Sequence, residues 1–340
     1  MTVHDQPSIS IAIIGGGPGG LGTAIALSEL PFVSVKLYEQ APKPREVGAG
    51  SSIGRNAWNV LNLLGAAEGI RGGKLGYSWQ RNGRTCEPVN LDSDSSEALA
   101  DEQAEEDPRY AAIRARRTRL QAALLEKVPA GTIQFGKNVV SMRDLGADQG
   151  VWLGFRDGTD TTADYVVGAD GIRSGTLAFP VLIPISSIDH IKDIPTSNGW
   201  WHGLNSHLYF ARVDDESEKE PQLCEITIRS YNEPVTPDRA ATWAIPATNE
   251  RLSLDFGHAQ EYNPRIQELL KAVPEGTRRE FAMVAGPCLQ EITAWGKVAL
   301  IGDASHPLSG AFGSGAAFAM EDGWILARTL ELEHSRNPIT

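Results

Sequence analysis

The chain has 340 residues, of which 41% are hydrophobic and 22% are charged, with 35 glycines, 20 prolines and three cysteines. This length and composition predict one large domain or two closely associated domains around a substantial core, and they exclude disordered, collagenous and disulfide-stapled proteins. The net charge of -12 argues against a nucleic-acid backbone or an anionic membrane as the main partner.

The cysteines and the N-terminal residues bear on the compartment. Cys86, Cys224 and Cys288 are odd in number, far apart and in no metal-binding spacing, which predicts reduced thiols and no bound metal. Residues 1–7 lack the basic and apolar regions of a signal peptide, and no stretch approaches the roughly 18 apolar residues of a membrane span. We therefore expect a cytoplasmic protein with no membrane span.

The first predicted unit is a strand, a helix and a second strand. An apolar, β-branched run ends at Ile14 and is followed by Gly15-Gly16-Gly17. Apolar residues then recur at helical spacing as far as Ser28, and a period of two returns from Val33 to Glu39. Such a unit of about 30 residues is typical of parallel α/β folds.

Further elements are predicted in chain order. We expect helices at 56–65, 114–128 and 316–332, short antiparallel strands within 139–167, a second β-rich region at 206–256 and a buried strand at 298–301. No repeat or low-complexity linker separates these segments, so we expect two interwoven parts. The predicted fold class is α/β, with a Rossmann-like parallel sheet and a β-sheet domain inserted discontinuously.

The glycine motif Gly15-x-Gly17-x-x-Gly20 lies between the first strand and the first helix. In such a motif the first glycine permits a tight turn, the second lets the backbone approach a pyrophosphate, and the third lets the helix pack closely on the strand. Glu39 ends the second strand, where an acid can accept hydrogen bonds from an adenosine ribose. The carboxylate disfavours a 2′-phosphate, so the motif predicts FAD or NAD at this site.

Two later motifs choose between these cofactors. Asp170-Gly171 follows the apolar strand Tyr165-Val166-Val167, and Gly302-Asp303 follows the apolar strand at 298–301. A plain NAD-dependent dehydrogenase explains neither motif. With the three motifs in this order, the chain resembles the single-component (class A) FAD-dependent aromatic hydroxylases, the family of the p-hydroxybenzoate and salicylate hydroxylases.

The resemblance covers nearly the whole chain and is greatest to the salicylate-hydroxylase-like branch, through Glu46 to Gly50 and Asn56-Ala57. It implies an FAD-binding domain made of residues 8–80, 108–175 and 286–340, and a substrate-binding β-rich domain made of residues 81–107 and 176–285. It also implies NADH or NADPH as a co-substrate and a small aromatic substrate with O2, and a homodimer is compatible with it.

Roles for individual residues follow from the resemblance. It assigns Glu39 to the adenosine ribose, Asp303 to the ribityl chain, and Asp170 to FAD and NAD(P)H binding. Arg117 should contact the cofactor, although a solvated helix face is the alternative because Arg114, Arg116 and Arg119 are also cationic. Asp303 could instead cap the following turn.

The resemblance also involves two loops near the flavin. Arg45 and Gly50 lie in the loop after Glu39, where the family places backbone against FAD, and ordinary loop chemistry is the alternative. The helix that begins near Gly315 and Ala316 should direct its N-terminal amides at the flavin pyrimidine edge. We expect His306 to brace its own loop by a local hydrogen bond and not to act as a base.

The substrate should lie over the sheet formed by residues 200–256. The aromatic and polar side chains available there are Trp200, Trp201, His202, His207, Tyr209, Arg229 and Trp243. Tyr209 is our candidate catalytic residue, as a phenol that orients the substrate, with core packing as the alternative. His202 and His207, five apart on one predicted strand, should point to opposite faces, which argues against a metal pair.

The implied activity is FAD-dependent hydroxylation of an aromatic or polyketide-like molecule with NAD(P)H and O2, through a flavin C4a-hydroperoxide. The sequence departs from the family in lacking a helix after Ser174, in Pro180 and Gly310, and in ending at Thr340. These departures leave two alternatives, a degenerate or truncated non-catalytic flavoprotein and a flavin-dependent reductase that does not oxygenate.

Overall fold

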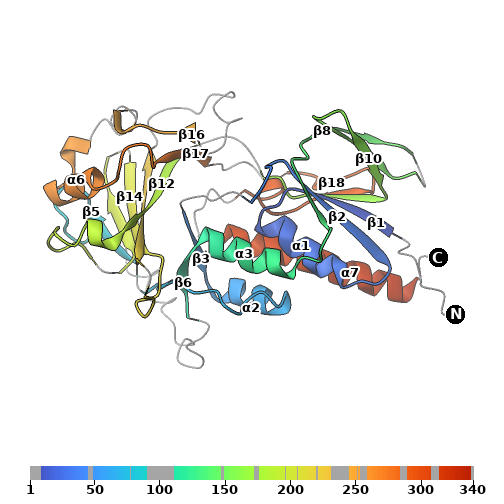
Figure 1. Cartoon of the computed structure of the whole chain (residues 1–340), viewed down its shortest axis with the longest axis horizontal. Coiled ribbons are helices and arrows are strands. Elements are labelled where there is room, and N and C mark those ends of the chain that lie inside the picture. Colours follow the sequence, from blue (N-terminus) through green and yellow to red (C-terminus); the bar gives the residue numbers. More distant parts are fainter. Residues whose placement is uncertain are drawn as a thin grey trace.

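The computed structural model describes residues 9–44, 49–76, 78–89, 111–146, 149–171, 176–195, 197–204, 206–219, 221–230, 245–250, 252, 259–283, 289–307 and 314–337. Two parts lie side by side, one built on a six-stranded sheet and the other on a seven-stranded sheet (Figure 1). Within the described residues, none of the helices has both the length and the apolar character that a membrane crossing needs.

The six-stranded sheet contains the predicted strand-helix-strand unit. Its strand order is β18 (Thr293–Ala294), β19 (Val298–Leu300), β11 (Tyr165–Gly168), β1 (Ile9–Ile14), β2 (Val33–Glu39) and β7 (Ile133–Phe135). All neighbours pair in parallel except the edge strand β18, which is antiparallel to β19. The α/β fold class and the parallel sheet predicted from the sequence are therefore confirmed.

Helices cover one face of this sheet, and a small antiparallel sheet covers the other (Figure 1). The helices are α1 (Pro18–Ser28), α2 (Arg55–Leu63), α3 (Arg117–Lys127) and α7 (Gly315–Arg336). The small sheet has the order β10 (Asp160–Ala163), β9 (Val151–Phe155) and β8 (Val139–Asp144). Because side chains alternate along a strand, Ile11 and Ile13 join the helix-side core while Ala12 packs with Leu153 of the small sheet.

Small residues let α1 and α7 approach closely. A Cβ added to Gly19 would lie 2.9 Å from the Cβ of Ala319, and one added to Gly323 would overlap the side chain of Thr23. Larger side chains at these positions would force the helices apart. This contact holds the first turn of α7 beside the glycine loop that opens α1.

The seven-stranded sheet has the order β16 (Ile245–Pro246), β17 (Arg279–Met283), β12 (Thr176–Pro184), β15 (Leu223–Ser230), β14 (Ser206–Arg212), β13 (Gly199–His202) and β5 (Trp79–Asn82). Every pair is antiparallel except β13 with β5. One face packs through Phe179, Ile228 and Trp201 against α6 (Pro264–Lys271). Short 3-10 helices lie at Ile185–Ser187, Ala259–Glu261 and Gly302–Ala304.

A third small sheet joins the two parts and corrects one prediction. It has the order β3 (Gly50–Ile53), β6 (Ile113–Arg116) and β4 (Gly73–Lys74). The helix predicted over 114–128 begins only at Arg117, because Ile113 and Ala115 are buried on one face of β6 while Arg114 and Arg116 point to the other. This alternation with a period of two indicates a strand.

Candidate functional site

The candidate cofactor residues lie at the carboxyl edge of the six-stranded sheet. Gly15 follows β1, Glu39 ends β2, Asp170 follows β11 and Asp303 follows β19. In an open parallel sheet, ligands bind at the carboxyl ends of the strands, where neighbouring connections leave in opposite directions. These carboxyl ends face the part that contains the seven-stranded sheet (Figure 1).

The glycine loop fits closely between β11 and α1. Gly15 has φ of +109°, and a Cβ there would lie 2.5 Å from the carbonyl oxygen of Ala169. A Cβ on Gly20 would overlap the carbonyl oxygen of Gly15, whereas a Cβ on Gly17 would meet no atom within 4 Å. Gly15 and Gly20 are therefore required by the fold itself, while the space at Gly17 is open for a ligand.

This contrast predicts different effects for two alanine variants. Gly20→Ala should lower the free energy of unfolding by about 3 kcal/mol because its methyl group meets backbone that cannot move aside. Gly17→Ala, at φ -75° and ψ 176°, should leave that free energy within about 0.5 kcal/mol of the parent and weaken FAD binding about tenfold or more. Urea unfolding and FAD titration test both; equal destabilisation of the two variants would contradict the prediction.

Glu39 is held against the glycine loop by its own hydrogen bonds. Its carboxylate accepts from the backbone N–H of Gly16 at 2.7 Å and from that of Ala41 at 2.7 Å. The side chain therefore has a fixed position at the end of β2, next to the start of α1. A carboxylate oxygen has further lone pairs with which it can accept from ribose hydroxyls.

Asp303 and Arg117 face one another across this edge. Burial raises the pKa of Asp303 above its ordinary value, while Arg117 and His306 act in the opposite direction. Burial lowers the pKa of Arg117. The Asp303 carboxylate acts to raise this pKa, and the Arg114 guanidinium lowers it further. The Arg117 backbone N–H is tied to the carbonyl of Ala49 at 3.0 Å. Arg117 is half-buried and interacts with Asp303, which favours a role at the cofactor edge over the solvated helix face considered as the alternative.

His306 makes a local backbone hydrogen bond to Gly302 at 2.8 Å, as expected from the sequence, but its ring contacts another element. Its Nε2 lies 2.6 Å from Oδ2 of Asp322 on α7, and the same oxygen accepts from the backbone N–H of Gly302 at 2.8 Å. Asp322 thus ties α7 to both sides of Asp303. Sequence reasoning missed Asp322 because the contact joins residues on separate elements.

Two helix N-termini meet beside Asp303. Neither α1 nor α7 has a side-chain cap at its N-terminus or an acidic residue in its first turn, so their N–H groups and positive dipole ends can face an anion. Gly315 opens α7, and a Cβ on it would lie 3.7 Å from Oδ1 of Asp303. Ala316 follows it and is half-buried. Two uncapped helix ends, an open glycine and the Asp303 carboxylate fit a pyrophosphate joined to a polyol, which are parts of FAD.

The remaining described candidates for cofactor binding, Asp170 and Gly50, have different surroundings. Asp170 lies directly after β11, next to Gly171 at φ +72°. Gly50, in β3, donates its backbone N–H to Oε2 of Glu225 at 3.0 Å, and a Cβ there would crowd Arg114 and Glu225. Contact between the two parts therefore requires glycine at position 50 whether or not FAD lies there. Arg45 and Gly310 lie outside the described residues.

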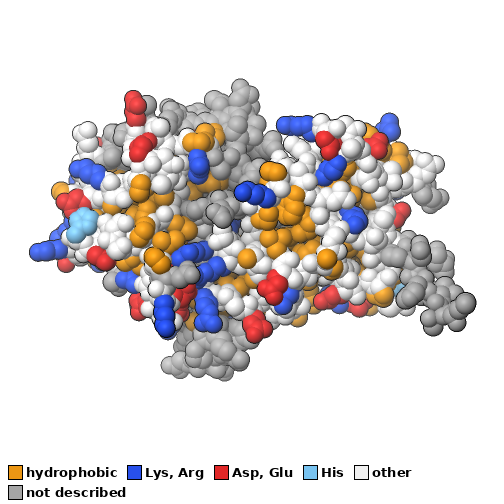
Figure 2. Space-filling model, viewed as in Figure 1, with side chains coloured by type: hydrophobic (Ala, Val, Ile, Leu, Met, Phe, Trp, Pro, Cys, Tyr) orange, Lys and Arg blue, Asp and Glu red, His pale blue; other side chains and the backbone are white. Residues whose placement is uncertain are grey.

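The three other arginines near Arg117 hold the two parts together. Arg114 makes two hydrogen bonds to Glu225, at 2.8 and 2.9 Å. Arg116 makes two to Asp214, at 2.7 and 2.6 Å, and Arg119 makes two to Glu218, at 2.7 and 2.5 Å. Lys and Arg side chains gather near β6, where the two parts meet (Figure 2). The acidic partners of Arg114, Arg116 and Arg119 lie more than ninety residues away in sequence, so no local pattern predicts these ion pairs.

We call one face of the seven-stranded sheet the substrate face and define it by Gln80, Trp200, His202, His207, Tyr209 and Arg229. Cross-strand register places these side chains on the same side, through the pairs Trp200 with Tyr209 and His207 with Arg229. Glu225 shares this side and reaches Arg114 of β6, so the substrate face is turned toward the FAD-binding part. Pro180 shares it too, opposite Thr227. Trp201 lies on the other face, in the core, and Trp243 lies outside the described residues.

Aromatic and cationic groups alternate on the substrate face. Arg229 lies over the Trp200 ring, 4.6 Å from its centroid, and Trp200 packs against Tyr209 at 4.8 Å between centroids. Arg114 lies 5.3 Å from the Tyr209 centroid. Burial raises the pKa of Tyr209 to about 12, so its hydroxyl stays protonated. Tyr209 is 9% exposed, so it also packs in the sheet. The alternative of core packing therefore applies together with the proposed role in orienting the substrate.

The two histidines correct another expectation. His202 and His207 do not share a strand: they face each other across the β13–β14 hairpin, with Nδ1 atoms 3.0 Å apart. The prediction of opposite faces was wrong because a turn separates them. Even so, the described residues hold no group of three or more His, Cys, Asp or Glu side chains that could bind a metal.

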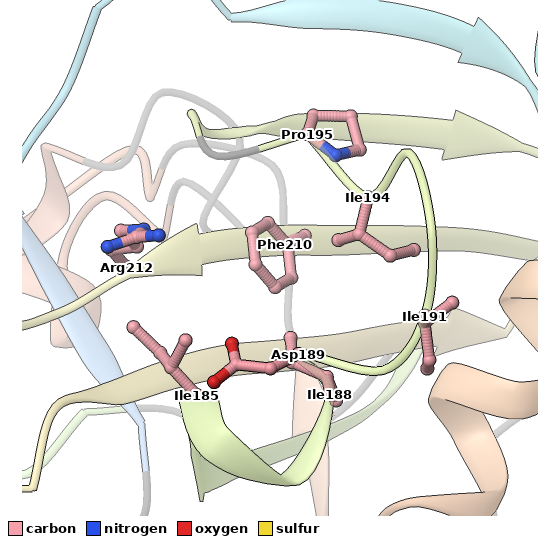
Figure 3. A pocket seen from close by; sticks show the side chains of 8 residues that line it. All are labelled: Ile185, Ile188, Asp189, Ile191, Ile194, Pro195, Phe210 and Arg212. Atoms are coloured by element: carbon pink, nitrogen blue, oxygen red, sulfur yellow. The ribbon is translucent and has the colours of Figure 1, made fainter.

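A cavity of about 140 Å³ lies on the opposite face of the seven-stranded sheet (Figure 3). Ile185, Ile188, Ile191 and Phe210 form its apolar walls, and Asp189 and Arg212 are its charged groups. Phe210 and Arg212 alternate with Tyr209 along β14, so they point away from the substrate face. This cavity is therefore not the place where a substrate would meet the flavin.

The fold and this edge define an FAD-dependent oxidoreductase in which a second, largely antiparallel sheet faces the cofactor edge. The chain belongs to the FAD-binding domain family, whose model matches residues 8–335, and within it to the class A flavin monooxygenases. It is 26% identical to 6-hydroxynicotinate 3-monooxygenase of Pseudomonas fluorescens over 94% of this chain and 82% of that protein. It is 28% identical to a salicylate hydroxylase of Pseudomonas putida over 96% of this chain and 78% of that protein.

Solved structures show the same architecture. The structure of a salicylate hydroxylase substrate complex superposes with a TM-score of 0.73 at 24% identity, covering 98% of this chain and 81% of that one. The fold class and the family inferred from the three motifs are both confirmed, and FAD is the cofactor.

Proposed function

We propose that this monooxygenase hydroxylates a small aromatic molecule on the substrate face, with NADH or NADPH as reductant and O2 as oxygen donor. One observation carries the proposal: the substrate face, with its aromatic and polar side chains, is turned toward the edge that holds Glu39, Arg117 and Asp303. We assign the six-stranded part to FAD and the seven-stranded part to the substrate, following the boundaries expected from the sequence, except that β5 at 79–82 belongs to the second part.

In this proposal the chain binds and orients both molecules. FAD, when bound, supplies the redox chemistry with O2. Glu39 accepts from the adenosine ribose, Asp303 from the ribityl hydroxyls, and the α7 N-terminus stabilises negative charge near the flavin ring. Trp200 and Tyr209 offer aromatic surface to the substrate ring, and Arg229 offers positive charge to an acidic substituent. The sheet excludes water from the face that the ring occupies.

The test is the absorbance spectrum of the purified protein, followed without oxygen while NADH or NADPH is added. We expect flavin bands that bleach, with salicylate and other hydroxybenzoates present in parallel because a substrate can gate reduction. Oxygen is then admitted, and product and hydrogen peroxide are quantified.

Each outcome selects one function. A hydroxylated product supports the proposal. Bleaching with only peroxide across the hydroxybenzoates and heteroaromatic acids supports a reductase that does not oxygenate. Bands that never bleach support a non-catalytic flavoprotein, and a protein that takes up no FAD would contradict the cofactor assignment.

A further inference from the structure

The cavity on the far face of the seven-stranded sheet is walled by a run of isoleucines. After β12 an isoleucine recurs at every third residue, at Ile185, Ile188, Ile191 and Ile194. The backbone N–H of Ile188 donates to the carbonyl of Ile185 at 2.9 Å, and that of Ile191 donates to the carbonyl of Ile188 at 2.9 Å. Turns of this kind place side chains three residues apart above one another. The first three isoleucines therefore face the same side, and Ile194 completes the wall (Figure 3).

The cavity has room for about one six-membered ring. Ile188, Ile191 and Phe210 are buried and form its inner part, while Ile185 and Ile194 are half-buried and lie nearer to solvent. Its volume of about 140 Å³ is close to that of engineered apolar cavities, about 150 Å³, which take up benzene. An apolar group that enters such a cavity supplies the dispersion contacts that its lining otherwise lacks.

Two side chains of opposite charge mark one end of the cavity. The Asp189 carboxylate is directed toward the end at which Arg212 lies and away from Ile191 (Figure 3). Both charges act on the thiol of Cys224, which is opposite Arg212 in the sheet. Burial raises the pKa of this thiol to about 12, the Arg212 guanidinium acts to lower it, and the Asp189 carboxylate acts to raise it. The two charges therefore lie at the same end, beside β14 and β15.

Arg212 is held only weakly by its neighbour on the protein. Its Nη1 lies 3.4 Å from Oε1 of Glu216, whose side chain is 80% exposed. Such an exposed and long ion pair contributes little free energy, whereas a guanidinium can bind a carboxylate through two parallel hydrogen bonds. Asp189 is exposed and can accept hydrogen bonds from an ammonium group. A ligand can therefore replace Glu216 at Arg212 at small cost.

Opposite charges at one end select the class of ligand. Arg212 attracts a simple carboxylic acid but Asp189 repels it, and the reverse holds for a simple amine. A free α-amino acid carries both charges, and its side chain, on one carbon. We propose that this cavity binds a free α-amino acid with a large apolar side chain, with the carboxylate on Arg212, the ammonium group on Asp189 and the side chain among the isoleucines and Phe210. The site is independent of the proposed function, because the sheet separates it from the substrate face.

The ligand requirement is measured by fluorine NMR, with 4-fluoro-L-phenylalanine added to the full, FAD-loaded chain. We expect saturable binding with a Kd on the order of 1 mM, as for a small ligand at a partly exposed site. The probe 4-fluorohydrocinnamate lacks the ammonium group and 4-fluorophenethylamine lacks the carboxylate, so each should bind about tenfold more weakly. L-Leucine should displace the amino-acid probe, and glycine should not.

Three results of this ligand series would overturn the proposal without any variant. They are no saturable binding of the amino-acid probe up to tens of millimolar, equal or tighter binding of either singly charged probe, and displacement by glycine as effective as that by leucine.

Variants then locate the bound probe. Arg212→Met should weaken 4-fluoro-L-phenylalanine about tenfold and strengthen 4-fluorophenethylamine, because the cation that repels the amine is removed. Asp189→Asn should likewise weaken the amino acid and strengthen 4-fluorohydrocinnamate. Glu216→Gln should bind the amino acid at least as tightly as the parent, because Arg212 loses a competing carboxylate.

The matched control lies on the other face of the same sheet. Arg229→Met also removes a guanidinium, but from the substrate face, and should leave the affinities of all three probes unchanged. Loss of binding in Arg229→Met, with parental binding in Arg212→Met and Asp189→Asn, would assign the probe to the substrate face and overturn the proposal. Failure to hydroxylate any aromatic substrate would leave this site unaffected, so the two proposals fail separately.

Discussion

Glu39→Arg is expected to reduce FAD affinity by about 100-fold or more. The proposed ribose contact would lose two charge-assisted hydrogen bonds of about 1.5 kcal/mol each, and a cation would lie beside the α1 N-terminus. Asp303→Ala should have an effect of similar size, because the proposed contact between its carboxylate and the ribityl hydroxyls would be lost. Flavin fluorescence titration of the apoprotein measures both affinities.

Two controls separate the loss of ligand contacts from general effects. Glu68→Arg makes the same change in charge on an exposed loop residue and should leave FAD affinity unchanged. Asp303→Asn keeps the shape of the side chain but only part of its acceptor capacity, so its affinity should fall between those of the parent and the alanine variant. Full FAD occupancy in both Glu39→Arg and Asp303→Ala would contradict the assignment of these residues.

Glu225→Ala is expected to lower the free energy of unfolding by about 3–5 kcal/mol, because it leaves the Arg114 guanidinium without its carboxylate in a buried place. The Glu225 side chain is 2% exposed and also accepts from the Thr227 hydroxyl at 2.7 Å and from Gly50 N–H. Removing it therefore breaks the contact between the two parts at several atoms. Urea unfolding and thermal melting measure the loss.

A matched pair of variants tests this reasoning. Glu261→Ala breaks the exposed ion pair with Arg84, whose side chains are 69% and 41% exposed, and should cost less than about 1 kcal/mol. The double variant Arg114→Met, Glu225→Leu should be more stable than Glu225→Ala because no buried charge remains unpaired. Equal losses for Glu225→Ala and Glu261→Ala would contradict the structural role of the buried pair.

The same pair predicts a pH dependence. Burial alone would raise the pKa of Glu225, but the Arg114 charge and the hydrogen bonds to Arg114, Thr227 and Gly50 lower it below the ordinary value. The stabilisation is therefore complete above the unfolded-state pKa of a glutamate and is lost as pH falls through the lowered folded-state pKa. We expect the unfolding free energy of Glu225→Ala to vary less with pH in the acid range than that of the parent.

The sequence by itself determined the parts of this protein in which the physical constraint is local. The glycine motif, the strand before it and Glu39 lie within one short unit. Backbone sterics and the hydrophobic period in this unit depend only on residues that are near in sequence. Asp170 and Asp303 were also predictable, because each directly follows an apolar strand and the carboxyl ends of parallel strands meet at one edge. The order of these motifs then identified the family.

Tertiary structure decided everything that depends on register between distant strands. The strand Ile113–Arg116 gives only a short period of two and leads directly into a helix, so its local pattern does not separate it from that helix. Arg114 and Arg116 pair with Glu225 and Asp214 only when β6 packs against the second part. The spacing of His202 and His207 predicts one strand, whereas the β13–β14 hairpin places them opposite each other on two. Pairing between strands depends on packing across the whole sheet, which no local pattern of residues specifies.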